Sequence, residues 1–286
     1  LSPLYDLLKS EVLQNSYLQA DETTIRVLTS AKRGSSHTGY LWVYNSPAGK
    51  LCFFDYRTGR GQAGPDEILK DFTGALQTDG YAAYDHFKNR RDSSTDQPII
   101  TLLACMAHVR RKFFEAKTND QKRAEKALLF IQELYDIERK ARKGQLTYQA
   151  RKELRQDEAA PILQQFHEWL IDQQQRVVPK SAIGKAIAYT LNLWNRLERY
   201  IEDGHYEIDN NLIENQIRPV ALGRKNYLFA GSHNGAKRAA MIYSFMAICK
   251  MHNVNPEEWL TDVLNKIREH KVNQLDLLLP QNWKKF

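Results

Sequence analysis

Long apolar runs and closely spaced cysteines are both missing from this chain of 286 residues. No stretch approaches the roughly 18 consecutive apolar residues that a membrane-spanning helix needs, so a helical membrane protein is excluded. The chain opens at Leu1 without a basic segment or an apolar core, and we interpret this start as an internal cut in a longer protein rather than a signal peptide. The three cysteines, Cys52, Cys105 and Cys249, lie far apart in apolar runs. They argue against a disulfide framework and favour a reducing cytoplasm.

Acidic residues are absent from one long segment, 215–256, although the chain as a whole is only moderately basic. Lys and Arg number 41 against 34 Asp and Glu, which leaves a net charge of +7. Six basic residues of the acid-free segment nearly equal this excess: Arg218, Arg224, Lys225, Lys237, Arg238 and Lys250. A localised basic segment favours a polyanionic partner such as nucleic acid, whereas charge alone would fit a solvated basic face equally well.

Two hydrophobic patterns divide the chain. Alternating or β-branched stretches predict five strands, at 17–28, 39–43, 51–56, 75–80 and 99–106. Helical periodicity alone runs from 112 to 203, where Gly204 is expected to cap the last helix. Further helices are predicted at 1–16, 66–72, 209–217 (ended by Pro219) and 237–251, the last apolar on nearly every face. We therefore predict an α/β protein with a mixed five-stranded sheet, flanked by helices and interrupted by a large all-helical insertion.

Three acidic residues stand where a sheet scaffold would present them. Asp21 lies within the first predicted strand, Asp79 ends the fourth just before Gly80, and Glu214 lies on the helix 209–217. Two Asp and one Glu that converge could hold Mg²⁺, which prefers carboxylate oxygens. Each residue also has an ordinary structural reading, as a strand end, a turn, or a helical pair of Glu214 with Arg218. The spacing of the three acids alone does not decide between a metal site and these structural roles.

The sequence motifs around these acids resemble those of a known protein family. The chain resembles the insertion-sequence-66 family of bacterial transposases over almost its whole length. The matching stretches are QADET (19–23), QTDGYAAY (77–84), ACMAHVRRKF (104–113), and a long run from IDNN (208–211) through ENQIRP (214–219) to GRKNYLFAGS (223–232).

The resemblance implies a ribonuclease-H-like catalytic domain with an Asp-Asp-Glu triad on Asp21, Asp79 and Glu214, and with Mg²⁺ (Mn²⁺ as a substitute) as cofactor. It implies a linker helix at 1–16, a discontinuous catalytic domain at 17–112 and 205–256, a helical insertion at 113–204, and a C-terminal helix and tail at 257–286. Members of the family are longer at the N-terminus, with a coiled coil, a zinc-binding motif and a DNA-binding part. None of these is visible here, and Cys105 with His108 is only half a zinc site, so no zinc is expected.

Basic residues near these motifs are candidates for DNA contact. His108 and its basic neighbours follow the fifth predicted strand, where they could hold phosphates, although His108 could equally be a structural histidine. The residues that we predict to contact DNA are His108, Arg110, Arg111, Lys112, Arg218, Arg224, Lys225, Lys237 and Arg238.

The function expected from the resemblance is that of a transposase core, which hydrolyses a phosphodiester at the element end and transfers the 3′-OH into target DNA. A ribonuclease-H-like nuclease that only hydrolyses is the enzymatic alternative, and an inactive DNA-binding descendant of a transposase is the non-enzymatic one. The expected partners are double-stranded DNA and a second copy of the chain, and the expected location is the bacterial cytoplasm, with no membrane association.

Overall fold

The chain forms two compact units in a computed structural model that describes residues 1–28 and 35–284. The first unit comprises 1–76, 81–101 and 212–286, and the second comprises 77–80 and 102–211. The last two residues of the predicted C-terminal tail lie outside the described part.

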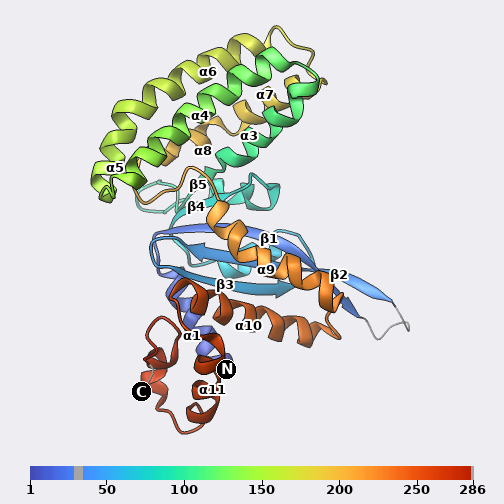
Figure 1. Ribbon diagram of the computed structural model, residues 1–286, viewed down its shortest axis with the longest axis vertical. Helices are drawn as coiled ribbons and strands as arrows, with labels where there is room; N and C mark the ends of the chain where they lie inside the picture. The colour runs from blue at the N-terminus through green and yellow to red at the C-terminus, as the bar shows by residue number, and fades with distance from the viewer. Residues whose placement is uncertain (29–34, 285–286) are drawn as a thin grey trace. The chain divides into compact units, whose positions relative to one another are not determined.

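A mixed five-stranded sheet has the order β3-β2-β1-β4-β5, and the first three strands form an antiparallel meander (Figure 1). The strands are β1 (Tyr17–Leu28), β2 (Ser36–Ser46), β3 (Leu51–Arg57), β4 (Gly74–Thr78) and β5 (Ile100–Ala104). The bounds of β1 match the prediction, which rested on its β-branched residues. The predicted α/β class and the mixed five-stranded sheet are confirmed.

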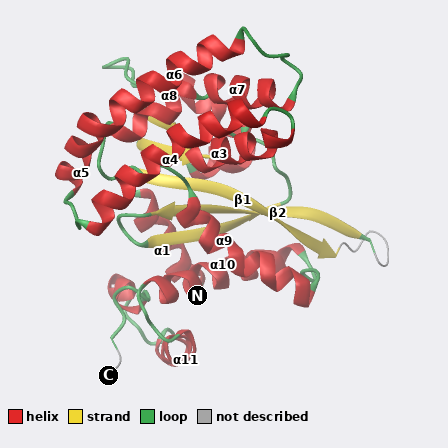
Figure 2. Ribbon diagram, turned by 45° about the horizontal axis from the view of Figure 1, so that its top comes forward, coloured by secondary structure: helices red, strands yellow, loops and turns green. Residues whose placement is uncertain are grey.

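The first unit buries one face of the β1–β3 meander under helices. α1 (Ser2–Leu13) and α10 (His233–Met251) lie on the same side of these strands in both views (Figure 2). The backbone N–H of Phe54 in β3 donates to Ser244 Oγ in α10 over 2.9 Å. The remaining helical segments are α2 (Ala63–Ile68), η1 (Ala82–Asn89), α9 (Asn211–Tyr227), α11 (Pro256–Lys266) and η5 (Val272–Leu278).

The second unit is helical apart from its short strand ends. Its elements are α3 (Met106–Glu115), η2 (Ala116–Thr118), α4 (Gln121–Lys143), α5 (Tyr148–Leu154), η3 (Arg155–Ala159), α6 (Ala160–Gln174), α7 (Ala182–Asn192), α8 (Trp194–Leu197) and η4 (Glu198–Ile201). Its core is aromatic: the rings of Phe130 and Phe166 stack at 5.2 Å, and Trp194 meets Phe166 edge-on at 5.7 Å.

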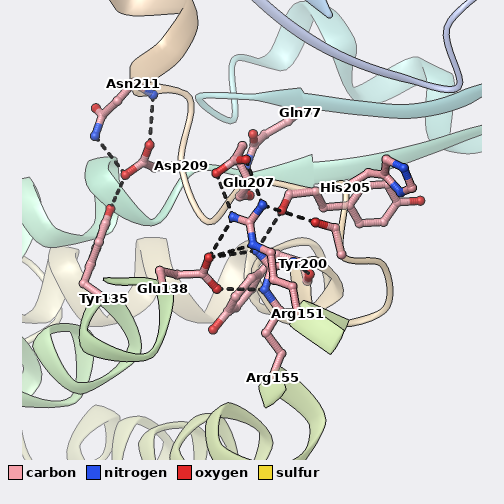
Figure 3. A network of polar contacts seen from close by, with 12 residues as sticks. Gln77, Tyr135, Glu138, Arg151, Arg155, Tyr200, His205, Glu207, Asp209 and Asn211 are labelled. Carbon is pink, nitrogen blue, oxygen red and sulfur yellow. Dashed lines mark hydrogen bonds and ion pairs between the residues drawn. The ribbon is translucent and has the colours of Figure 1, made fainter. Parts of the chain in front are cut away.

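A buried polar network ties α4, α5 and η3 to the chain that leaves this unit (Figure 3). Arg155 is fully buried, and all five of its N–H groups donate hydrogen bonds. Two reach the carboxylate of Glu138, and three reach the carbonyls of Tyr200, Asp203 and Tyr206. Burial by itself would raise the pKa of Glu138, but hydrogen bonds and charge from Arg155 and Arg151 outweigh it and hold that pKa below 4.5.

Two predictions about helix ends are wrong. The helix α9 continues through Pro219 to Tyr227. Proline removes only one N–H donor, and the burial of Val220 beyond it supports the continuation. The short helix predicted at 66–72 lies instead at Ala63–Ile68, with Pro65 in its first turn, where a missing N–H costs no hydrogen bond.

Two predictions about packing are also wrong. A Cβ on Gly204 would lie 1.8 Å from the carbonyl oxygen of Tyr148, so this glycine permits a close backbone approach; the preceding helix ends at Ile201. The residues of 237–251, apolar on nearly every face, predict a buried helix. The helix α10 is instead buried along one face only, and residues such as Ile242, Tyr243 and Met246 line an open groove.

Candidate active site

Two of the three predicted acids, Asp21 on β1 and Glu214 on α9, line one cavity of about 390 Å³ in the first unit. Asp21 pairs with Val43 across the antiparallel β1–β2 ladder, and its neighbour Glu22 also lines the cavity. The carboxylate of Asp21 accepts a hydrogen bond from the N–H of Glu22 at 2.7 Å. Asn215 and Arg218 complete the polar part of the lining.

An arginine from the loop after β3 neutralises the other acid at this cavity. Arg60 donates to the carboxylate of Glu22 at 2.6 Å, and the Glu22 side chain is only 4% exposed. The guanidinium of Arg60 lies 4.0 Å from the ring centroid of Tyr81, whose hydroxyl donates to the Arg60 carbonyl at 3.0 Å. Glu22 is therefore held by an arginine, while Asp21 next to it lines the cavity.

The helix α9 presents a second carboxylate and a cation to the cavity. Glu214 and Arg218 are both exposed, and no ion pair joins them among those of the described residues. The surface helical pair that is the structural reading of Glu214 is therefore not formed. Pro219 has no N–H for the carbonyl of Asn215 one turn earlier, so that oxygen lacks its ordinary helical donor beside the cavity.

The third predicted acid, Asp79, belongs to the second unit, where Tyr189 of α7 is its neighbour. The hydroxyl of Tyr189 donates to the Asp79 carbonyl at 2.8 Å, and Lys112 Nζ lies 5.8 Å from the centroid of the Tyr189 ring. Burial and then the negative charge of Asp79 raise the pKa of Tyr189 to about 12, against the opposing charge of Arg111. Asp79, Arg111 and Lys112 thus surround one tyrosine.

Gly80 allows the chain to turn directly after Asp79. Its φ of +89° lies in the region that favours glycine, and a Cβ there would meet Leu193 at 2.9 Å. The glycine of the motif Thr78-Asp79-Gly80 is therefore required by the backbone geometry of the turn, independently of any role of Asp79.

The chemistry of the donors at the cavity fits a hard divalent cation. Asp21 and Glu214 offer carboxylate oxygens, and Asn215 offers amide and carbonyl oxygens, which are the ligand types that Mg²⁺ takes. Within residues 1–28 and 35–284, no three His, Cys, Asp or Glu side chains are grouped as they would be around a shared ion.

The predicted DNA-contacting residues fall into both units. Arg110, Arg111 and Lys112 are exposed on α3 and His108 is half-buried, all in the second unit. In the first unit Lys225, Lys237 and Arg238 are exposed. Arg224 is half-buried and donates to the carbonyl and hydroxyl oxygens of Thr24, both at 2.6 Å, so it also ties α9 to β1.

Sequence reasoning missed Asn215 at the cavity, Arg60 and Tyr81 beside Glu22, and Tyr189 beside Asp79. Tyr81 and Asn215 lie inside two of the matching stretches, 77–84 and 214–219, and this position is the signal that could have identified them. Arg60 lies in a glycine-rich loop, and Tyr189 lies on a helical stripe that indicates core packing, so neither had a local signal.

Two protein-family models match this chain. The model of the transposase IS66 family matches residues 1–238, and that of the IS66 C-terminal element matches 244–281. Two relatives from Sinorhizobium fredii, the uncharacterized proteins y4jD and y4hP, are each 33% identical over 294 and 306 residues. These alignments cover 99% and 100% of this chain but 57% and 54% of the relatives, so the chain spans about half the length of the curated relatives it matches.

No solved structure matches the chain at significant similarity. None of its described helices is both long and apolar enough to cross a membrane. The sheet order, the interposed helical region and both family matches agree with a ribonuclease-H-like fold. This chain belongs to the IS66 family of transposases.

Proposed function

We propose that the chain is the catalytic core of a DNA transposase that uses divalent metal to hydrolyse a phosphodiester at the element end and then joins the 3′-OH to target DNA. The observation that carries the proposal is the shared cavity of Asp21 and Glu214, with Arg218 beside them. Paired carboxylates next to a cation suit a phosphate that must be bound and attacked while its negative charge is balanced. Membership of the IS66 family supports the same reading.

In this proposal Asp21, Asp79 and Glu214 would hold Mg²⁺, for which Mn²⁺ could substitute. The ions would activate the attacking oxygen and stabilise the leaving oxygen of the phosphodiester. Arg218 binds a non-bridging phosphate oxygen, and the pair of Glu22 with Arg60 keeps a second carboxylate of β1 neutralised beside the cavity. In the first step a water oxygen bonds to phosphorus, the P–O3′ bond breaks, and the 3′ oxygen leaves with a proton. In the second step the oxygen of that 3′-OH gives up its proton and bonds to a target phosphorus, the target P–O3′ bond breaks, and the target 3′ oxygen leaves with a proton.

Double-stranded DNA is the proposed partner, both at the element ends and at the target. The exposed basic residues Arg110, Arg111, Lys112, Lys225 and Lys237 are the proposed phosphate contacts, and a dimer on DNA is the proposed assembly.

The test compares the full-length protein with Asp21→Asn, Asp79→Asn and Glu214→Gln on labelled element-end DNA with Mg²⁺. Each substitution keeps the shape of the side chain but removes an anionic ligand oxygen. Each should therefore lose nearly all cleavage and joining while retaining DNA binding and thermal stability. The losses should not add in double variants, because one missing ligand already disables the site.

Matched controls come from exposed acids elsewhere in the first unit. Asp71→Asn and Glu257→Gln make the same chemical changes at positions outside the cavity and should keep full activity. Normal cleavage by any one of the three site variants would remove that residue from the proposed site. Cleavage without joining would identify the hydrolytic nuclease instead of the transposase.

A further inference from the structure

An apolar groove of about 610 Å³ lies in the first unit beside the acidic cavity. The segment after α9, the helix α10 and the strand β1 form its walls. Its lining includes three aromatic side chains, Tyr227, Phe229 and Tyr243, and the cation Arg238. Phe229 is 44% exposed and Tyr227 is 38% exposed, so their rings are accessible to a ligand rather than used by the core.

The backbone holds this aromatic segment in a defined position. Ala230 pairs with β1 in a parallel bridge, its N–H donating to the Arg26 carbonyl at 2.7 Å while its carbonyl accepts from the Leu28 N–H at 2.9 Å. Leu228 has a φ of +60°, which is uncommon for a residue with a side chain. Such a conformation persists where surrounding contacts impose it, so Phe229 is presented on a fixed loop.

The charge around the groove is entirely positive along the chain that forms most of it. Residues 215–256 contain no acid, and Lys225, Lys237 and Arg238 are exposed there. Aromatic faces with a basic surround are the features by which proteins bind unpaired nucleotides, because bases stack on rings while cations contact phosphates.

The groove and the acidic cavity share the same two elements. Asp21 lines the cavity and Ile25 lines the groove, and both point to the same face of β1. Four residues of strand separate their Cα atoms by about 13 Å. This distance corresponds to about four stacked nucleotides at 3.4 Å each. Arg218 and Pro219 of α9 likewise border the cavity and the groove respectively.

We propose that this groove binds unpaired nucleotides of the DNA strand, about four positions from the phosphate that occupies the acidic cavity. The location of that phosphate rests on the proposed function, whereas the binding of unpaired bases by the groove does not. The aromatic rings stack on the bases, and Arg238 with Lys225 contacts the flanking phosphates.

The experiment measures binding in EDTA, where metal-dependent cleavage does not occur. A short duplex with a single-stranded extension is compared with the blunt duplex of the same sequence. The unmodified protein should bind the extended duplex more tightly. It should also quench 2-aminopurine placed in the extension, because the fluorescence of this base falls when it stacks. This second measurement requires no variant.

Phe229→Ala should weaken binding of the extended duplex roughly 5- to 150-fold per stacked base lost, and leave the blunt duplex nearly unaffected. Tyr227→Phe retains the ring and should retain the preference. Phe114→Ala is the matched control, since Phe114 is 59% exposed on α3 and lies outside the groove. Thermal melting verifies that each variant folds.

Equal affinity of the unmodified protein for both duplexes, without quenching, would overturn the proposal. An unchanged preference in Phe229→Ala would also overturn it. If that variant instead lost self-association, the groove would be a protein-docking surface. Failure of the triad variants to lose cleavage would refute the proposed function and leave this binding result unaffected.

Discussion

Replacing Arg155 with Met should destabilise the helical unit far more than its single position suggests. Arg155 is fully buried, and its guanidinium makes five hydrogen bonds. Methionine has a similar length and remains apolar, so the substitution removes the polar contacts with little loss of packing.

The loss in the free energy of unfolding can be worked out from the hydrogen-bond acceptors that Arg155 leaves without a donor. The carbonyls of Tyr200, Asp203 and Tyr206 would each lose a donor, at about 1 kcal/mol or more apiece for a buried polar group. Glu138 would keep Arg151, which donates to its Oε2 at 2.7 Å, so its charge would remain paired. We therefore expect a loss of about 3–5 kcal/mol in the free energy of unfolding, most of it from the three buried carbonyls that lose their donor.

The pH dependence supplies an independent check. Because the pKa of Glu138 is lowered in the folded state, its contribution is present above the unfolded value near 4.5 and is lost as the pH falls through the folded value. Removing Arg155 removes much of the cause of this lowering. The variant should therefore lose less of its remaining stability between pH 7 and pH 4 than the unmodified protein does.

Urea unfolding followed by far-ultraviolet circular dichroism measures both effects. Arg176→Met is the matched control, because Arg176 pairs with Asp172 on the surface of α6 with 63% of its side chain exposed, and should cost less than about 0.5 kcal/mol. Arg155→Lys keeps the charge but loses the planar guanidinium, so its loss of stability should lie between those of Arg155→Met and Arg176→Met. A cost for Arg155→Met below about 1 kcal/mol, or a lysine variant as stable as the unmodified protein, would refute the reasoning.

Two further predictions concern the first unit. Gly74→Ala should cost roughly 2–4 kcal/mol in urea unfolding, because φ is +133° and the new Cβ would meet the Ser16 carbonyl oxygen at 2.2 Å. Gly59→Ala, which meets no atom within 4 Å, should be nearly neutral, and equal costs would contradict the steric argument. For DNA binding, Lys225→Ala with Lys237→Ala should reduce the slope of log affinity against log salt by about 1.8, since each lost phosphate contact contributes about 0.9. Lys180→Ala with Lys185→Ala, in the second unit, should reduce this slope less. The reverse ranking would remove Lys225 and Lys237 from the proposed phosphate contacts.

The sequence pattern predicts those secondary-structure elements that depend only on neighbouring residues. The bounds of β1 and the position of Asp21 on it follow from the β-branched residues of 17–28, which favour a strand whatever lies around them. The continuation of α9 past Pro219 could not be predicted, because it depends on the burial of Val220 against distant residues. Likewise Glu138 and Arg155 look like ordinary surface charges of helices in the sequence. Only the tertiary structure brings three carbonyls from 200–206 within reach of one guanidinium.

The residues of the candidate site likewise divide into those that sequence motifs identify and those that only the tertiary structure reveals. Family motifs identified Asp21 and Glu214, and the structure brings these two to one cavity. Their assignment as metal ligands, together with Asp79, stays a prediction. Arg60 reaches Glu22 from a loop 38 residues away, a contact that no spacing rule encodes.

The bond between Phe54 and Ser244 also constrains the order of events during synthesis. The two residues are 190 positions apart, and Phe54 belongs to the edge strand β3. At about 5–20 residues per second, the ribosome needs roughly 10–40 s to make the intervening chain. Throughout that interval the apolar face of the β1–β3 meander has no α10 to cover it, while the helical unit is completed first. A nascent chain of this protein therefore exposes a strand edge and an aromatic sheet face for many seconds, which makes it a natural client for chaperones that bind at the ribosome exit.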